Sequence, residues 1–247
     1  MHPNTIVQMP ITNRLGEDLD IMLHEGTREG VLVFMGHGVT GDKDRPLLVA
    51  LAEGLAEQGW SCLRISFSGN GESEGKFEES TITKEVGDLD AVLGAIPKEV
   101  RVIYVGHSMG GAVGVKTAAG DSRIVGLVSL AGMVHCADFV KREFGDLVPD
   151  QDVMWEEQDC PLSKAFVDDL QQIGSLVPQA AKIQQPWLLV HGSADDVVPL
   201  KDSQDARDAA KCDLQWLEID GAGHVFDADS YPKIIGSMDL WLNEHFG

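Results

Sequence analysis

The chain has 247 residues, of which 40 are acidic and 19 basic, so that its net charge is −21. Binding to a nucleic-acid backbone needs clustered Lys and Arg, and this charge argues against it. No apolar run approaches the roughly 18–20 residues of a membrane span, so we expect no membrane partner. The first twenty residues lack a basic segment followed by an apolar one, which predicts no export signal and a cytoplasmic location.

The four cysteines are scattered along the chain at Cys62, Cys136, Cys160 and Cys212. They form no C-x-x-C pair and have no interleaved histidines at the spacing of a zinc site. We therefore expect free thiols and no metal centre, with a bridge between Cys136 and Cys160 as the alternative.

Strand-like runs alternate with helical stretches. Two opening runs, residues 4–12 and 19–26, flank a turn-like segment and predict an antiparallel hairpin. Six later runs are almost continuously apolar, as parallel strands buried on both faces are: residues 30–38, 61–69, 101–108, 124–132, 186–195 and 214–224. Helices are predicted at residues 45–60, 81–96, 109–120, 201–211 and 229–247. The pattern predicts an α/β fold with a mostly parallel central sheet of about eight strands, flanked by helices.

One interval is too long for a simple crossover between strands. Residues 133–185 follow the sixth predicted strand and contain the amphipathic stretches CADFVKREF and PLSKAFVDDLQQIGSLV. We interpret them as an inserted helical cap, or lid, on a core formed by residues 1–132 and 186–247.

The sequence VGHSMGG, residues 105–111, lies between a predicted buried strand and a predicted helix. A sharp strand-to-helix turn strains the serine backbone and leaves little room for side chains two positions away, which explains Gly106 and Gly110. Such a turn would present the Ser108 hydroxyl at the carboxyl end of the sheet.

A serine hydroxyl needs a base, and the base needs an acid that orients it. Asp195 comes just past one predicted strand and His224 just past the next. Each alone is as easily explained as a turn residue, but the order Ser, Asp, His at three strand ends favours the three together. Asp196 and Asp227 are the alternative acids.

Acyl transfer also needs two backbone N–H groups that stabilise an oxyanion. One is expected from Met109, directly after the nucleophile. The other is expected from the loop after an early strand, MGHGVTGDKD, where Gly38 permits close approach and Val39 is our candidate donor. Three further histidines are expected to hydrogen-bond locally: His37, His107 and His191.

Five motifs in order, HGVTG, RISFSGNGESEG, GHSMGG, HGSADDVVP and GAGH, resemble the α/β-hydrolase superfamily of serine esterases. Within it, the chain is most similar to the cinnamoyl and feruloyl esterases and related small carboxylesterases. The resemblance implies a Ser108–His224–Asp195 triad, an oxyanion hole from Val39 and Met109, and no metal or organic cofactor. Val39 departs from the pattern, because an aromatic residue is common at this position.

The predicted cap carries four aromatic residues that could line an acyl pocket, Phe139, Phe144, Trp155 and Phe166. The alternative is that they form the small core of the cap itself.

The leading hypothesis is a serine carboxylesterase that hydrolyses small soluble esters through an acyl-enzyme, aromatic acyl esters of the feruloyl type among them. A monoacylglycerol lipase, a thioesterase or an acyl-peptide hydrolase would use the same triad. A non-catalytic receptor on the same scaffold is the alternative from another class. The predicted partner is a small-molecule ester, and the oligomeric state stays open, with a homodimer as one option.

Overall fold

A seven-stranded sheet forms the centre of the molecule in the computed structural model, which describes residues 6, 7 and 9–247. Its strands lie in the order β1-β3-β2-β4-β5-β6-β7, and only β1 runs antiparallel to its neighbour. The strands are β1 (Ile21–His24), β2 (Val31–Gly36), β3 (Ser61–Ile65), β4 (Arg101–His107), β5 (Ile124–Leu130), β6 (Trp187–Gly192) and β7 (Leu214–Ile219). Strands β2, β3 and β6 are buried along their whole length, as their continuous apolar runs predict.

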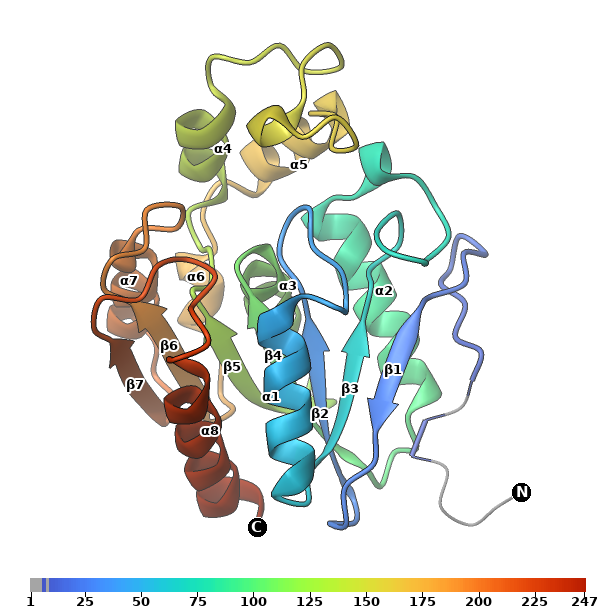
Figure 1. Ribbon diagram of the computed structural model, residues 1–247, viewed down its shortest axis with the longest axis vertical. Coiled ribbons are helices and arrows are strands. Elements are labelled where there is room, and N and C mark those ends of the chain that lie inside the picture. The colour runs from blue at the N-terminus through green and yellow to red at the C-terminus, as the bar shows by residue number, and fades with distance from the viewer. Residues whose placement is uncertain (1–5, 8) are drawn as a thin grey trace.

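Helices cover both faces of the sheet (Figure 1). One face packs against α1 (Pro46–Glu57) and α8 (Tyr231–Phe246). The other face packs against α2 (Ile82–Ala95), α3 (Met109–Ala118), α6 (Val177–Ala180) and α7 (Leu200–Ala209). This three-layer arrangement confirms the predicted α/β class and brings the carboxyl ends of β2 and β4–β7 to one edge.

The described residues form seven strands where about eight were predicted. Of the first predicted strand, residues 4, 5 and 8 lie outside the described residues, and the described remainder forms only a bridge between Thr12 and Asp18. Pro10 lacks the N–H that a sheet ladder needs, which disfavours a strand there. The second predicted strand is β1, and it pairs with β3 instead of forming a hairpin.

Between β5 and β6 the chain forms a helical insertion, residues 131–186, above the carboxyl edge of the sheet (Figure 1). It contains α4 (Cys136–Phe144), a short 3-10 turn η2 (Met154–Glu156), α5 (Lys164–Ile173) and α6. Another 3-10 turn, η1 (Phe77–Glu79), precedes α2. The outgoing and returning segments of the insertion are hydrogen-bonded to each other: the Leu176 amide donates to the Val134 carbonyl at 2.7 Å.

Helix α7 also holds the start of the insertion. One Asp202 carboxylate oxygen accepts the amides of Val134 and His135 at 2.8 and 3.0 Å. The His135 ring bonds Asp205 at 2.9 Å and Ser175, near the far end of the insertion, at 3.3 Å. Two carboxylates on one face of α7 therefore attach the insertion to the core.

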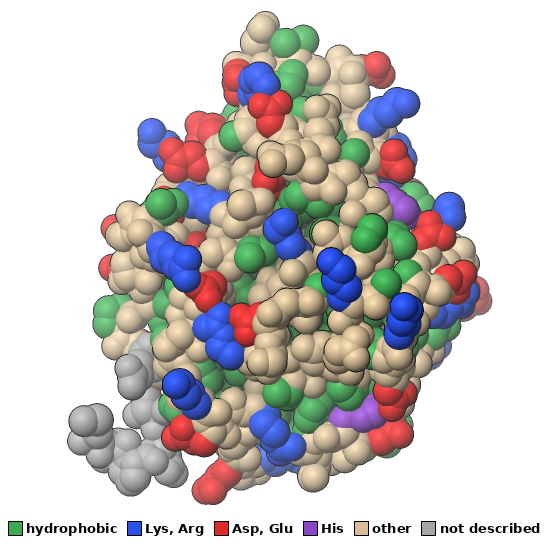
Figure 2. All heavy atoms as spheres, turned by 180° about the vertical axis from the view of Figure 1, so that it is seen from behind, with side chains coloured by type: hydrophobic (Ala, Val, Ile, Leu, Met, Phe, Trp, Pro, Cys, Tyr) green, Lys and Arg blue, Asp and Glu red, His purple; other side chains and the backbone are tan. Residues whose placement is uncertain are grey.

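The surface shows no continuous field of one sign on the face seen in Figure 2, where acidic and basic side chains are interspersed with apolar ones. All four cysteines are free, which confirms the prediction, and Cys136 and Cys160 are not bridged. Within the described part of the chain, no helix has the length and apolar character that crossing a membrane requires.

Candidate active site

Ser108 lies between the end of β4 and the start of α3, in a strained backbone conformation. Its φ is 54° and its ψ −117°, a region that non-glycine residues rarely adopt. A Cβ added at Gly106 would lie 2.2 Å from the Gly110 carbonyl oxygen, and one at Gly110 would lie 2.5 Å from the His37 carbonyl oxygen. The turn therefore accommodates only glycine at both positions, and it places the serine side chain at the carboxyl edge of the sheet.

The structure brings the three predicted residues into one hydrogen-bonded array. Ser108 Oγ is 2.9 Å from His224 Nε2, and His224 Nδ1 is 2.9 Å from Asp195 Oδ2. A carboxylate only accepts, so Nδ1 carries the proton and Nε2 is free to accept the serine O–H. Because the three residues come from the ends of β4, β6 and β7, the parallel sheet is what assembles them.

Asp195 is the acid that contacts the histidine. Its side chain is fully buried, and its Oδ1 accepts the amides of Val197 and Val198 at 3.0 and 2.9 Å. Burial acts to raise the pKa of Asp195, but the hydrogen bonds from His191, His224 and the Val198 amide outweigh it and lower the pKa below its ordinary value. Asp195 therefore stays ionised beside the histidine.

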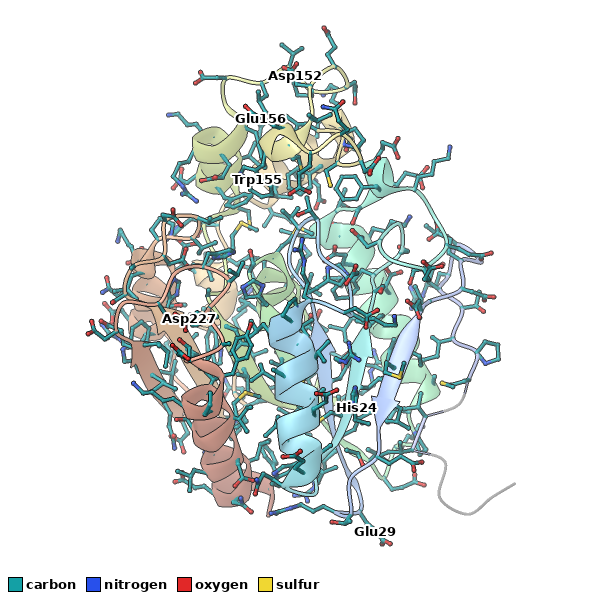
Figure 3. The ribbon with its side chains drawn as sticks, viewed as in Figure 1. His24, Glu29, Asp152, Trp155, Glu156 and Asp227 are labelled. Carbon is teal, nitrogen blue, oxygen red and sulfur yellow. The ribbon has the colours of Figure 1, made fainter. Side chains whose placement is uncertain are left out.

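The two alternative acids lie elsewhere. Asp196 is exposed. Asp227 bonds the amide and hydroxyl of Ser230 at 3.0 and 2.7 Å, which makes it a turn residue ahead of α8. Figure 3 labels Asp227 on that loop, and only Asp195 of the three carboxylates bonds His224.

The loop after β2 lies against the serine. A Cβ added at Gly38 would lie 2.7 Å from the Ser108 Cβ, so this loop approaches Ser108 as closely as its backbone allows. Val39 follows in the wall of the cavity described below, and Met109 is the first residue of α3. Among the described residues, neither of their amides donates to a protein acceptor.

His37 shapes that loop, as its sequence position suggested. Its Nδ1 is 2.8 Å from the Gly38 carbonyl oxygen and its Nε2 accepts the Phe67 amide at 2.9 Å. Burial lowers the pKa of His37 to about 4, so the ring is neutral at physiological pH. A neutral ring with one donor and one acceptor satisfies both contacts.

A cavity of about 470 Å³ opens above Ser108 and His224. Most of its wall is apolar, and it is contributed by the loop after β2, the start of α1, the loop around Val197 and the segment from His224 to Tyr231. The insertion contributes Trp155 and Glu157, and Arg45 is the basic residue of the wall. A mostly apolar cavity with a few polar groups near a nucleophile is the usual form of a small-molecule site.

Of the four aromatic residues predicted for a pocket, the structure places only Trp155 on this cavity. The prediction is corrected for Phe139, Phe144 and Phe166, which are at most 3% exposed and pack together inside the insertion. Their helical spacing on α4 and α5 turns them inward, toward the interface of the two helices. They are the core of the insertion.

Trp155 reaches the cavity through an unusual backbone. Trp155 and Glu156 have φ values of 47° and 63°, so two consecutive non-glycine residues are left-handed. The indole packs on Phe144 with ring centroids 4.9 Å apart and donates to Glu143 at 3.3 Å. In Figure 3, Trp155 lies on the side of the insertion that faces the sheet, below Asp152.

The sequence did not point to every residue of the site. Arg45 and Glu157 carry no local signal, because they reach the cavity only when α1 and the insertion are in place. His107 was expected to hydrogen-bond locally, but its Nε2 is 2.9 Å from the carbonyl oxygen of His224, which is distant in the sequence.

Comparison with known proteins agrees with this fold. A family model described as serine aminopeptidase, S33 matches residues 28–153, which is half of the chain. The chain belongs to this family. It is thus a member of a family of serine hydrolases with the α/β-hydrolase fold.

Curated relatives include the human mitochondrial palmitoyl-protein thioesterase ABHD10, which is 27% identical over 173 residues. That match covers 65% of this chain and 55% of the relative, so the chain spans about half the length of the curated relatives it matches. Another relative, the esterase LipC of Mycobacterium tuberculosis, is 27% identical over 92 residues, or 30% of this chain and 23% of LipC.

Solved structures match over nearly the whole chain. Est1E from Butyrivibrio proteoclasticus, with ferulic acid bound, has a TM-score of 0.81 and 22% identity, and covers 96% of this chain and 99% of its own. The mouse α/β-hydrolase domain-containing protein 10 has a TM-score of 0.77 and 19% identity, and the match covers 92% of this chain and 95% of the mouse chain. At these identities the likeness concerns the fold.

Proposed function

We propose that the chain is a serine carboxylesterase with Ser108 as nucleophile, His224 as base and Asp195 as the acid that orients it. The observation that carries the proposal is the hydrogen-bonded array of these residues, which opens onto a mostly apolar cavity. Neither a turn nor a ligand receptor requires a strained serine that is hydrogen-bonded to a histidine and backed by a buried carboxylate.

The geometry supports a two-step acyl transfer. His224 Nε2 takes the proton of Ser108 as its oxygen attacks the ester carbonyl, and the amides of Val39 and Met109 stabilise the oxyanion. His224 then protonates the leaving alcohol and later activates the water that hydrolyses the acyl-enzyme. Asp195 keeps the proton on His224 Nδ1 and stabilises the imidazolium.

We also propose that residues 133–185 act as a cap over a core of residues 1–132 and 186–247. Trp155 and Glu157 lie in the cavity wall opposite the sheet, so an acyl or alcohol group bound there would contact the insertion. Trp155 offers an aromatic face, and Est1E, a structural relative, is known with ferulic acid bound. Small esters with apolar or aromatic acyl groups are therefore the proposed substrates.

A thioesterase is the second candidate, because two of the curated relatives are named palmitoyl-protein thioesterases. The chemistry differs only in the leaving group, which is a thiol in place of an alcohol. The apolar cavity wall suits an acyl chain as well as an aromatic acid.

The proposal is tested with a Ser108→Ala variant and a substrate panel. Wild-type protein should hydrolyse p-nitrophenyl butyrate and react with a fluorophosphonate at Ser108, whereas the variant should do neither at an unchanged melting temperature. Methyl ferulate, palmitoyl-coenzyme A and an aminoacyl p-nitroanilide then separate an aromatic esterase, a thioesterase and a peptidase by kcat/KM. Hydrolysis retained by Ser108→Ala would overturn the assignment.

A further inference from the structure

A second histidine contacts the carboxylate of Asp195. His191 lies on β6 with no exposed side-chain surface, and its Nε2 is 3.2 Å from Asp195 Oδ2 and 2.9 Å from the Val198 carbonyl oxygen. His224 Nδ1 approaches the same Oδ2 at 2.9 Å. One carboxylate oxygen therefore lies between two imidazole rings.

The partners of His191 determine where its proton lies. Val198 offers a carbonyl oxygen and Asp195 a carboxylate oxygen, and both are acceptors only, so Nε2 must carry the hydrogen. Nδ1 is then bare, and the Ser203 hydroxyl, 2.7 Å away on α7, donates to it. Ser203 is 1% exposed, so this bond is sheltered from water. Ser203 and His191 form a second Ser–His pair on Asp195, with the roles of the two ring nitrogens exchanged.

This second pair is not a second catalytic site. Neither His191 nor Ser203 lies in the wall of the cavity above Ser108, and both are enclosed between β6 and α7. The Ser203 hydroxyl donates to the bare Nδ1 of His191, so its oxygen faces a ring nitrogen inside the protein and not a substrate. Any influence of the pair on chemistry must pass through Asp195.

We propose that His191, held in place by Ser203, is a positioning residue that orients the carboxylate of Asp195 toward His224. The inference rests on the proposed function, since it gives Asp195 a catalytic task. With His191 in place the carboxylate has four contacts: two amides donate to Oδ1, the His224 ring donates to Oδ2, and His191 Nε2 lies 3.2 Å from the same Oδ2. That set determines its plane and leaves no rotation that satisfies all four.

His191 and His224 both contact the negatively charged Oδ2 of Asp195. A hydrogen bond to an ionised carboxylate stabilises the ionised form, so removing His191 makes Asp195 more basic. A more basic carboxylate holds the protonated His224 ring more firmly. The acid limb of the kcat/KM profile should then shift toward higher pH.

Other groups face the same histidine and must be kept constant in such a test. His107, on β4, stacks on the His224 ring with centroids 4.9 Å apart, and burial lowers its pKa to about 3, so it stays neutral. The cavity wall adds Arg45 and His37 from the loop after β2, Glu157 from the insertion and Tyr231 from α8. None of them is changed by a substitution at His191 or Ser203.

The experiment compares His191→Leu, which removes the N–H, with His191→Gln, whose amide N–H can reach the Nε2 position. Each variant is titrated with a fluorophosphonate to count active sites, and kcat and KM for p-nitrophenyl butyrate are measured from pH 5 to 9. We expect His191→Leu to lose about tenfold in kcat per active site, with little change in KM and an acid limb shifted to higher pH. His191→Gln should recover most of the rate.

Ser203→Ala is the second variant, and it keeps the experiment decisive where His191→Leu does not fold. It leaves the ring in place without its Ser203 donor, so we expect the same direction of change and a smaller loss. Ser175→Ala is the matched control, because Ser175 bonds His135, which bonds Asp205, in a Ser–His–Asp cluster away from the cavity. The control should keep the wild-type pH profile.

The outcomes separate this inference from the proposed function. Folded His191→Leu and Ser203→Ala variants with wild-type kcat and an unshifted acid limb would overturn the positioning role alone. The positioning role would also be overturned if His191→Gln did not restore kcat and the Ser175→Ala control lost as much kcat as His191→Leu. A wild-type protein that neither reacts with the fluorophosphonate nor hydrolyses any ester would instead overturn the proposed function.

Discussion

His107 Nε2 donates a hydrogen bond to the backbone carbonyl of His224 at 2.9 Å, and the two rings lie 4.9 Å apart. Burial lowers the pKa of His107 to about 3, so this ring is neutral and keeps its donor throughout the working pH range. His107 thus supports the loop that carries His224, the proposed base.

Replacing His107 should therefore slow turnover without removing the nucleophile. His107→Phe keeps an aromatic ring against His224 but loses the N–H, and we expect kcat to fall about fivefold, as for one neutral hydrogen bond. His107→Gln, which keeps a donor, should lose less. Steady-state kinetics at pH 8 check this order, and equal rates for wild type and a folded His107→Phe would contradict it.

Gly38 should tolerate no side chain. A Cβ there would lie 2.7 Å from the Ser108 Cβ, so Gly38→Ala must displace the loop that carries the Val39 amide. We expect kcat to fall about 100-fold, the usual effect of losing one oxyanion donor, with a small change in melting temperature.

A second glycine provides the matched control for Gly38→Ala. At Gly87, inside α2, a Cβ would meet no atom within 4 Å. Gly87→Ala should leave kcat unchanged and stabilise the fold by about 0.5–1 kcal/mol. A Gly38→Ala variant as active as Gly87→Ala would exclude Val39 as the donor.

Arg142 should affect substrate binding more than turnover. It bonds Glu143 at 2.9 Å, Glu143 accepts the Trp155 indole N–H at 3.3 Å, and the Arg142 guanidinium donates to the Val197 carbonyl. Trp155 and Val197 both line the cavity, so one arginine on α4 connects two parts of its wall.

Arg142→Gln removes this connection, so Trp155 and Val197 are held less firmly in the cavity wall. We expect KM to rise several-fold, which corresponds to about 1 kcal/mol of binding free energy, and kcat to change less. Its neighbour Lys141 is exposed, and Lys141→Gln provides the control. Michaelis–Menten parameters for p-nitrophenyl butyrate test this, and a rise in KM shared by both variants would argue for a charge effect instead.

Glu85 should destabilise the protein at neutral pH. Its side chain is 1% exposed, and burial, followed by repulsion from Asp88, raises its pKa well above the ordinary value. In the unfolded chain the Glu85 carboxyl ionises near pH 4.3, whereas in the folded protein it stays protonated to a higher pH. The free energy of unfolding therefore falls as the pH rises from about 4.3 toward the folded-state pKa. Glu85→Gln removes the ionisable proton and should remove this decline.

Thermal unfolding between pH 4 and 8 measures the effect of Glu85→Gln. The variant should gain melting temperature at pH 7 relative to wild type and gain least at pH 4. Glu78→Gln, at an exposed acidic residue of η1, should leave the pH dependence unchanged. A decline with pH that persists in Glu85→Gln would assign it to another group.

Most of the fold could be predicted from the sequence because its elements carry local signals. Continuous apolar runs indicated β2, β3 and β6, and the helix predicted at residues 81–96 is α2, over Ile82–Ala95. Of the predicted hairpin, the described residues form only the bridge between Thr12 and Asp18, and β3 lies beside β1.

The residue types at the strand ends can be read directly from the sequence: a serine among glycines after β4, an aspartate after β6 and a histidine after β7. Which carboxylate contacts His224 follows from the folded chain, because Asp195 and Asp196 are adjacent in the sequence and only the Asp195 side chain is directed at the ring. Folding also turned three phenylalanines inward and brought the His107 ring to the backbone carbonyl of His224. Contacts between distant segments depend on packing across the sheet, and local sequence patterns carry no record of that packing.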